Sequence, residues 1–246
     1  MSNMKKILDM TDSEIVDTIQ SGKLNICVIG IGRIGLPTAL SFANSGLPTI
    51  GVDINEKLVE MINSRNFPLN DEPGYDIIFD KVINEKKFKA TTHFSEGVNY
   101  SDVIVLSLPT PMDEKNIPDY SSLLSIAKKL HDEISDGKLI IIESTVEPGF
   151  VENDFLKIIE GDDNKLKLGK NFALGVCPET ANPGQILNDF ERLPRLVGAM
   201  DEHTQNLITK IYKHVFTVEL IPMPNCKTAN AVKLTTNVFR DLNIAF

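Results

Sequence analysis

The most constraining feature of this sequence is a short apolar run that leads directly into three closely spaced glycines. The run is Cys27–Ile29, and the glycines follow in the order G-x-G-x-x-G, where a β-strand would turn into a helix. Such a turn can hold a dinucleotide, because the free N–H groups at the start of the helix face its pyrophosphate. The residues expected to form this turn are Gly30, Gly32, Arg33, Ile34 and Gly35.

Each glycine has a separate role in a turn of this kind. Gly30 permits the tight change of direction, Gly32 lets a pyrophosphate approach the backbone, and Gly35 lets the helix pack closely on the strand. Three glycines beside a strand can also form an ordinary tight turn. The interpretation therefore depends on the next segments of the chain.

A second strand and an acidic residue occur at the required spacing. Thr49–Val52 is the strand, and Asp53 ends it about 20 residues after the glycines. A carboxylate there can accept hydrogen bonds from both ribose hydroxyl groups of an adenosine, and it would repel the 2′-phosphate of NADP. Because no arginine directly follows Asp53, we expect NAD as the cofactor.

Apolar runs and helical spacing alternate along most of the remaining chain. Strands separated by helices predict an α/β fold, a Rossmann-like doubly wound parallel sheet with ligands at the carboxyl ends of its strands. We expect a helical extension over 1–24, the NAD-binding domain over 25–220, and the start of a long inter-domain helix over 221–246. The elements expected between Asp53 and Pro222 are helices at 56–64, 75–85, 121–134, 151–160 and 202–214, strands at 88–91, 103–108, 139–142, 171–176 and 195–198, and a last extended segment at 215–220.

Composition excludes several classes of partner. With 25 Lys and Arg against 34 Asp and Glu, the net charge is −9 and no basic cluster occurs, so neither nucleic acid nor an anionic membrane is expected. The three cysteines, Cys27, Cys177 and Cys226, are widely spaced, which favours neither a disulfide framework nor a zinc site. We expect no bound metal and a cytoplasmic protein. No apolar run approaches the length of a membrane span.

Three loops that come after expected strands carry unusual sets of residues. They should line one crevice, because the carboxyl ends of parallel strands share one edge of the sheet. Proline-rich loops suit sites that hold a ligand at a fixed distance, although ordinary turns remain an alternative. The residues expected to contact cofactor or substrate are Pro109 and Thr110 in the first loop, Ser144 and Thr145 in the second, and Glu179 in the third.

The last segment has the periodicity of an amphipathic helix. One face carries Asn230, Lys233, Asn237 and Arg240, and the opposite face is apolar, with Ala231, Leu234, Val238, Leu242 and Ala245. Periodicity alone favours a solvated polar face for the first set.

Taken together, these pieces resemble the UDP-glucose/GDP-mannose dehydrogenase family of nucleotide-sugar 6-dehydrogenases. From about Asn25 to the last residue, the matching pieces are VIGIGRIGLPTAL, GVDIN, the DEPG loop at 71–74, DVIVLSLPTPMDEKNIPD, ESTVEPG, CPE, RLVG and ANAVKLTTNVFRDLNIAF. The chain looks most like the UDP-N-acetyl-mannosamine and related UDP-N-acetylhexosamine dehydrogenases, because Asn182–Pro183–Gly184 ends the loop after Glu179. Thr180 stands where that subgroup often has arginine.

The resemblance implies oxidation of the C6 alcohol of a UDP-sugar to a carboxylate, with two hydride transfers to two NAD molecules and a cysteine thiolate that captures the aldehyde. It implies that Lys233 stabilises an oxyanion and that Glu179 assists proton transfer. Asn237 and Thr145 would position water. Contact with the substrate is implied for Glu179, Lys233, Asn237 and Arg240.

The family's nucleophile lies in a G-G-x-C-x-P-x-D segment, and none of the three cysteines here matches it. We therefore expect this chain to bind NAD without turnover, as a fragment or as one half of a split enzyme. The family implies a homodimer, or otherwise a partner that carries the separately encoded C-terminal half.

Two other functions fit parts of the sequence. One is a non-catalytic NAD-binding module that acts as a sensor or regulatory partner, in which Lys233, Asn237, Thr145 and Glu179 would be superfluous. The other is a hydroxyacid dehydrogenase with a similar glycine turn, against which the PTP, STVEPG and CPE loops argue.

Overall fold

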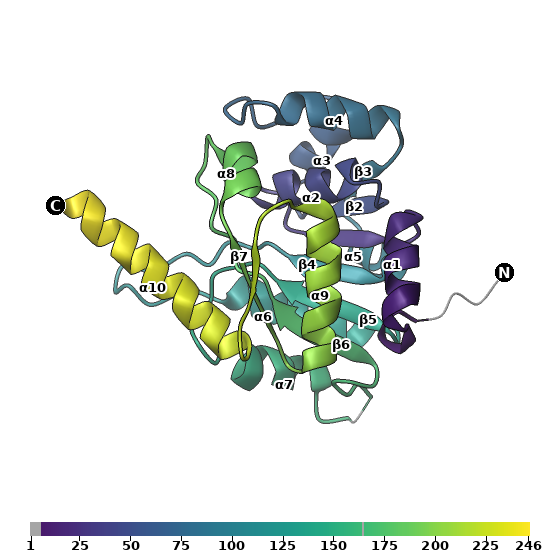
Figure 1. The fold of residues 1–246 in the computed structure, drawn as a ribbon, viewed down its shortest axis with the longest axis vertical. Coiled ribbons are helices and arrows are strands. Elements are labelled where there is room, and N and C mark those ends of the chain that lie inside the picture. The colour runs from purple at the N-terminus through teal and green to yellow at the C-terminus, as the bar shows by residue number, and fades with distance from the viewer. Residues whose placement is uncertain (1–5, 164) are drawn as a thin grey trace.

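The computed structural model describes residues 6–163 and 165–246, and an eight-stranded sheet forms its centre (Figure 1). In chain order the strands are β1 (Ile26–Ile29), β2 (Thr49–Val52), β3 (Phe88–Thr91), β4 (Val103–Leu106), β5 (Lys138–Ile142), β6 (Phe172–Val176), β7 (Arg195–Ala199) and β8 (Leu220–Pro222). The α-helices are α1 (Asp12–Gln20), α2 (Gly35–Asn44), α3 (Glu56–Asn63), α4 (Tyr75–Asn84), α5 (Phe94–Tyr100), α6 (Ser121–Glu133), α7 (Leu156–Glu160), α8 (Ile186–Arg192), α9 (Glu202–Val215) and α10 (Cys226–Ala245). A 3-10 turn, η1 (Ile7–Asp9), precedes α1, and a π-helical turn, η2 (Val151–Phe155), precedes α7.

The strand order determines where a ligand can bind. The sheet runs β3-β2-β1-β4-β5-β6-β7-β8, and the first six strands of the chain are parallel. β1 lies between β2 and β4, so the chain winds outward from β1 in both directions. A doubly wound sheet has its binding crevice at the carboxyl ends of the strands at this reversal. The Rossmann-like α/β fold predicted from the sequence is confirmed.

Strand β7 departs from the parallel pattern. It runs antiparallel to β6, and β8 then runs parallel to β7. The apolar sequence of β7 carries no information about its direction. The connection from β6 reaches α8, whose first turn is held at the carboxyl edge by the side chain of Glu72, so the chain enters β7 from that same edge.

The core consists of two apolar layers, one on each face of the sheet. Ile26 and Val28 of β1 pack with α2 and α9, whereas Cys27 and Ile29 pack with α6 and α10. This division follows from the alternation of side chains along a strand. Because both faces are covered, every residue of β1 is buried, and its sequence is an apolar run rather than an alternating pattern.

Several elements differ from the predicted ones. Helices α5 and α8 were not expected, and the helix expected at 151–160 begins with the π turn η2. Gly97 disfavours a helix locally, but a Cβ at this position would lie 2.9 Å from the Cys27 sulfur. The glycine therefore lets α5 pack directly on the sheet, and this tertiary contact overrides local propensity.

The helical extension expected before the first strand is divided into η1 and α1. Thr11 caps α1 and forms a capping box with Glu14, which fixes the start of the helix. Ile15 and Ile19 of α1 are buried, and α1 packs against α9. Residues 1–5 lie outside the described part of the chain.

Candidate functional site

The glycine-rich turn lies at the carboxyl end of β1, beside β4. Gly30 has φ +87°, a conformation that favours glycine, and a Cβ there would lie 2.5 Å from the carbonyl oxygen of Ser107. A Cβ on Gly35 would collide with the carbonyl oxygen of Gly30. Contacts within the protein therefore account for both glycines.

Gly32 is different, because no residue that the structure describes requires a glycine there. Its φ is not in the left-handed region, and a Cβ built there meets no described atom within 4 Å. Among the described residues, none caps the start of α2 with its side chain, and Ile34 occupies the N-cap position. Open space over Gly32 and uncapped N–H groups are the features that a bound pyrophosphate needs. The turn therefore fits the phosphate groups of NAD.

Asp53 is fixed beside this turn at the end of β2. Its Oδ2 accepts a hydrogen bond from the Ile31 N–H (3.0 Å), and its Oδ1 accepts one from the Asn55 N–H (2.9 Å). Each carboxylate oxygen has a second lone pair available for a ribose hydroxyl. The neighbouring Ile54 is 90% exposed, which leaves an apolar surface beside the carboxylate.

The Arg33 side chain pairs with the loop between α3 and α4. Its Nη2 lies 2.6 Å from Asp71 Oδ2 and 3.3 Å from Glu72 Oε1. The Arg33 guanidinium holds the pKa of the exposed Asp71 carboxyl below its usual value. In this structure the Arg33 side chain therefore binds protein carboxylates.

The two loops after β4 and β5 are tied together. The Leu108 N–H donates to Ser144 Oγ (2.8 Å), and Thr110 Oγ1 donates to the Thr145 carbonyl (2.8 Å). Ser144 is buried and its hydroxyl already serves the backbone, whereas Thr145 is half-buried and Pro109 is exposed. The sequence predicted that these loops share a crevice, and the structure places them at adjacent strand ends.

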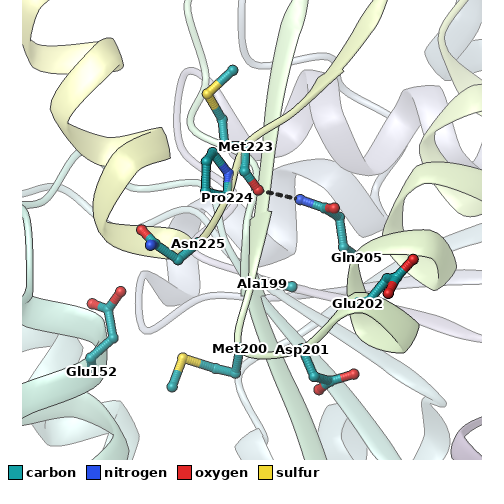
Figure 2. A pocket seen from close by; sticks show the side chains of 9 residues that line it. All are labelled: Glu152, Ala199, Met200, Asp201, Glu202, Gln205, Met223, Pro224 and Asn225. Carbon is teal, nitrogen blue, oxygen red and sulfur yellow. Dashed lines mark hydrogen bonds between the residues drawn. The ribbon is translucent and has the colours of Figure 1, made fainter.

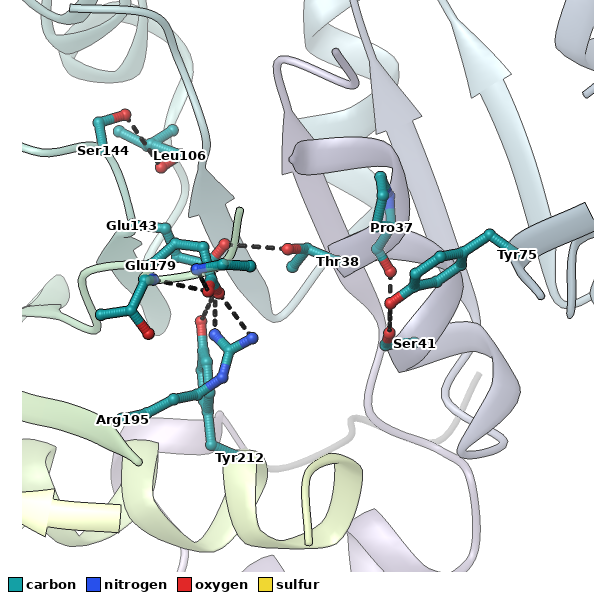
Figure 3. Close-up of polar contacts among 12 residues, drawn as sticks. Pro37, Thr38, Ser41, Tyr75, Leu106, Glu143, Ser144, Glu179, Arg195 and Tyr212 are labelled. Atoms are coloured by element: carbon teal, nitrogen blue, oxygen red, sulfur yellow. Dashed lines mark hydrogen bonds and ion pairs between the residues drawn. The ribbon is translucent and has the colours of Figure 1, made fainter. Parts of the chain in front are cut away.

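A buried cluster of charges lies next to the third loop (Figure 3). Arg195, at the start of β7, contacts Glu179 Oε2 at 2.6 Å and Glu143 Oε1 at 3.4 Å. Glu143 also accepts hydrogen bonds from the Tyr212 hydroxyl (2.8 Å) and from Thr38 Oγ1 (3.2 Å). One arginine thus joins two carboxylates from different loops.

The same cluster is shielded from water by aromatic rings. The guanidinium carbon of Arg195 lies 3.9 Å from the ring centre of Phe216 and 4.4 Å from that of Phe190. Burial raises the pKa of Glu143 to about 7, although the positive charge of Arg195 acts in the opposite direction. Burial acts to lower the pKa of Arg195, but the two carboxylates outweigh it and raise the pKa, so the guanidinium stays charged.

Sequence reasoning did not identify Glu143 or Arg195 as residues of this cluster. The available signal was a single arginine at the start of an apolar strand, RLVGA, and a glutamate at the end of another. Charged residues in such places need buried partners. The sequence does not show which partners they find.

Glu179 is held in place on both carboxylate oxygens. Its Oε1 accepts hydrogen bonds from the backbone N–H groups of Thr180 (2.6 Å) and Ala181 (2.8 Å), and its Oε2 pairs with Arg195. The carboxylate is therefore a fixed group at the carboxyl end of β6.

Helix α10 carries Lys233 to the same place. Lys233 is 6% exposed, and its Nζ donates to Asn237 Oδ1 at 3.0 Å. Burial lowers the pKa of the Lys233 ammonium, while the negative charge of Glu179 raises it. Two turns after Lys233, Arg240 Nη1 donates to Asn182 Oδ1 at 2.7 Å. The structure thus brings α10 against the 179–182 loop.

The two faces of α10 are not divided as in a usual amphipathic helix, because its buried side includes polar residues and part of its apolar side is exposed. Its buried residues are Cys226, Ala229, Asn230 and Lys233. Apolar residues of the opposite face are exposed, including Val238 (58%) and Leu242 (54%). A solvated polar face, which periodicity favoured, is therefore wrong for Asn230 and Lys233.

The three cysteines are poor candidates for a nucleophile. Cys27, Cys177 and Cys226 are free and buried, and burial raises the pKa of each thiol. A thiol acts as a nucleophile in its thiolate form, which burial in apolar surroundings disfavours.

A pocket of about 220 Å³ lies elsewhere, between the end of β7 and the start of α10 (Figure 2). Its lining includes Glu152, Met200 and Asn225, and none of the residues expected in the site takes part. Because β7 is antiparallel to β6, its end points away from the glycine-rich turn. This pocket is separate from the candidate site.

The described residues offer neither a metal site nor a membrane span. Over 6–163 and 165–246, no group of three or more His, Cys, Asp or Glu side chains is placed to hold a metal ion. In that same part of the chain, no helix combines the length and apolar character needed to cross a membrane.

Comparison with known proteins identifies the family. Residues 24–216 match the model of the UDP-glucose/GDP-mannose dehydrogenase family, NAD binding domain. A UDP-N-acetyl-D-mannosamine dehydrogenase from Campylobacter jejuni is 35% identical over 228 residues, which are 90% of this chain and 54% of that protein. One from Methanococcus maripaludis is 35% identical and is covered over 49% of its length.

Solved structures agree with this assignment. The structure of a UDP-D-ManNAc dehydrogenase from Pyrococcus horikoshii matches with a TM-score of 0.83 and 34% identity, over 90% of this chain and 52% of that one. A ternary complex of GDP-mannose dehydrogenase from Pseudomonas aeruginosa matches with a TM-score of 0.83 and 25% identity, over 89% of this chain and 50% of that one.

The chain belongs to the UDP-glucose/GDP-mannose dehydrogenase family and contains its NAD-binding domain. It spans about half the length of the curated relatives that it matches.

Proposed function

We propose that this chain is the NAD-binding half of a nucleotide-sugar 6-dehydrogenase that oxidises the C6 alcohol of a UDP-N-acetylhexosamine, such as UDP-N-acetyl-mannosamine, to the uronic acid with two NAD. The observation that carries this proposal is the buried Lys233 ammonium, held by α10 close to Glu179. The UDP-N-acetyl-D-mannosamine dehydrogenases among its relatives support the choice of sugar.

When bound, NAD accepts a hydride from the substrate. The residues of this chain would bind and orient it: Asp53 would hold the ribose, and the N–H groups of Gly32, Arg33 and Ile34 would face the pyrophosphate. Pro109, Thr110, Ser144 and Thr145 shape the adjacent loops, which two hydrogen bonds hold together. In this proposal Ser144 acts by holding the Leu108 backbone rather than by direct contact.

The substrate would lie between α10 and the 179–182 loop. Lys233 would stabilise the oxyanion that forms on the sugar carbon, because a poorly hydrated ammonium interacts strongly with a developing negative charge. Asn237 orients the Lys233 ammonium directly, and with Thr145 it would position water. Arg240 would contact the substrate from the next turn of the helix.

Glu179 would take part in proton transfer as a fixed carboxylate. Because Arg195 and two backbone N–H groups hold it, it can accept a hydrogen bond from a substrate hydroxyl or a water without reorganising. This preorganisation is the contribution of the buried cluster to the reaction.

The second oxidation needs a thiolate, which this chain does not present. All three of its thiols are buried with raised pKa values. We therefore propose that the chain binds NAD but turns over no sugar by itself, and that it acts in the cytoplasm with a partner that covers the exposed apolar face of α10. That partner is either a second copy in a homodimer or a C-terminal half of the family.

Calorimetry with NAD and NADP, followed by an assay for NADH with UDP-N-acetyl-mannosamine, tests the proposal. We expect NAD to bind much more tightly than NADP, no NADH from the chain alone, and two NADH per sugar when a C-terminal half of the family is added. Equal affinities for the two cofactors would overturn the NAD assignment. Turnover by the chain alone would overturn the requirement for an external thiolate.

A second candidate, a non-catalytic NAD-binding module, is favoured by the burial of every thiol. It predicts that NAD binds and that no C-terminal half of the family restores turnover.

A further inference from the structure

The carboxylate of Glu72 joins two loops that lie far apart in the sequence. Its side chain is 1% exposed. Its Oε1 accepts a hydrogen bond from the Gly184 N–H (2.6 Å), and its Oε2 accepts one from the Ile186 N–H (3.2 Å). Oε1 also lies 3.3 Å from Nη2 of Arg33, in the glycine-rich turn. One buried carboxylate therefore contacts both the cofactor turn and the segment that leads into α8.

The packing around Glu72 brings the two loops together. Gly74 has φ +86°, and a Cβ there would lie 2.6 Å from Leu187 Cδ2. A groove of about 330 Å³ lies between the 71–74 loop and α8. Pro73 lines it on the loop side and Leu187 on the helix side. The hydrogen bonds of Glu72 are therefore buried where the two segments pack closely against each other.

The segment on the far side of Glu72 continues to α10. Asn182, two residues before Gly184, donates through its N–H and its side-chain amide to Asp189 Oδ2 (2.8 and 3.0 Å). Its Oδ1 accepts a hydrogen bond from Arg240 of α10 (2.7 Å). Polar contacts therefore run from the glycine-rich turn, through Glu72 and the 182–186 segment, to the helix that carries Lys233.

We propose that Glu72 is a positioning residue that couples NAD binding at the glycine-rich turn to the order of the 180–186 segment. The inference rests on the proposed function, because it assigns the pyrophosphate to the turn and the substrate to that segment. When the turn is fixed by NAD, Arg33 is fixed with it, and Arg33 in turn restrains the carboxylate that holds Gly184 and Ile186. Coupling is reciprocal, so an ordered segment also favours NAD binding.

The two carboxylates that bind Arg33 supply a matched pair of variants. The Asp71 side chain is 60% exposed and, among the described residues, its carboxylate pairs with Arg33 alone, whereas the carboxylate of Glu72 is buried and contacts both sides. Exposed ion pairs contribute little. Asp71→Asn should therefore leave the coupling intact. Glu72→Gln keeps the shape of the side chain but replaces one acceptor oxygen with an NH₂ group, which cannot accept from a backbone N–H.

Residue-resolved hydrogen exchange with and without saturating NAD tests the coupling, with saturation established for each variant by calorimetry. In the unchanged chain and in Asp71→Asn, we expect NAD to slow exchange at Gly184 and Ile186 by about 5-fold or more. In Glu72→Gln we expect less than about 2-fold, a range typical of weakly coupled sites. Equal slowing in all three proteins, or no slowing in the unchanged chain with NAD bound, would overturn the proposal.

Arg33→Gln provides a second test, in case Glu72→Gln fails to fold. It leaves the Gly184 and Ile186 contacts of Glu72 in place and removes only the link to the turn, so slowing by NAD should also be lost. Retained slowing in Arg33→Gln would overturn the proposal. Failure of NAD to bind the unchanged chain would instead appear in the calorimetry, and it would count against the proposed function.

Discussion

The glycine-rich turn and α10 present ligand-binding groups in opposite ways. The turn offers backbone N–H groups over an open space, and its side chains either pack or, as with Arg33, pair with protein carboxylates. α10 offers buried side chains, Lys233 above all, that depend on the 179–182 loop and on the charged cluster behind it. A backbone site needs only a local conformation, whereas a side-chain site needs several segments to be in place. Perturbing the two regions should therefore have different consequences.

The largest effect is expected from disrupting the buried charged cluster around Arg195, because the side-chain site of α10 depends on it. Arg195→Met removes the cation that two buried carboxylates share, which should lower the free energy of unfolding by about 3–5 kcal/mol. Urea denaturation measures this, with Arg192→Met, an exposed arginine of α8, as the control. If both variants were equally stable, the cluster would not support the 179–182 loop.

The next effect concerns chemistry at α10. In an enzyme completed with the C-terminal half, Lys233→Ala should lower turnover by about 10²–10³-fold while NAD affinity changes little, because the ammonium acts on the oxyanion. Asn237→Ala should have a smaller effect. Lys227→Ala, an exposed lysine of the same helix, is the control. If Lys233→Ala kept near-normal turnover, α10 would not supply a catalytic group through Lys233.

At the glycine-rich turn the expected effect is smaller and falls on binding. Asp53→Asn keeps the side-chain shape but removes the charge, and it should weaken NAD binding by about 1–3 kcal/mol. The preference over NADP should narrow as well, since less negative charge then faces the 2′-phosphate. Calorimetry measures both, and Asp80→Asn on the exposed face of α4 is the control. If Asp53→Asn left NAD affinity unchanged, the ribose would not be bound by Asp53.

The pH dependence of the cluster is spread over a range of pH, so its effect over any single pH unit is the smallest. Burial raises the pKa of Glu143 from an ordinary value of 4.5 to about 7, so the folded state binds a proton that the unfolded state has lost. Stability should therefore fall as the pH rises from about 4.5 to about 7, with a slope of at most about 1.4 kcal/mol per pH unit from this group. Urea denaturation at several pH values measures the slope. In Glu143→Gln this contribution should disappear; an unchanged slope would assign it to another group.

The sequence predicted the sheet and the turn well, because both depend on short-range patterns. Apolar runs such as Cys27–Ile29 predict buried strands, and the spacing of Gly30 and Gly35 reports close contacts that no larger residue allows. The direction of β7 was not predictable, since a strand buried on both faces has the same apolar sequence in either orientation.

By itself, the sequence determined the doubly wound fold, the place of the cofactor turn and the carboxylate of Asp53 beside it. Only the tertiary structure decided which face of α10 is buried, which partners Arg195 takes, and that Glu72 links two loops. The physical reason is the separation along the chain between the residues on which each feature depends. The glycine-rich turn and the buried strands are signalled by runs of neighbouring residues in the sequence, whereas the placement of a buried charge depends on whichever distant groups can compensate it. For Lys233 and Glu72 those groups come from other segments of the chain, Glu179 for the one and Arg33 and Gly184 for the other.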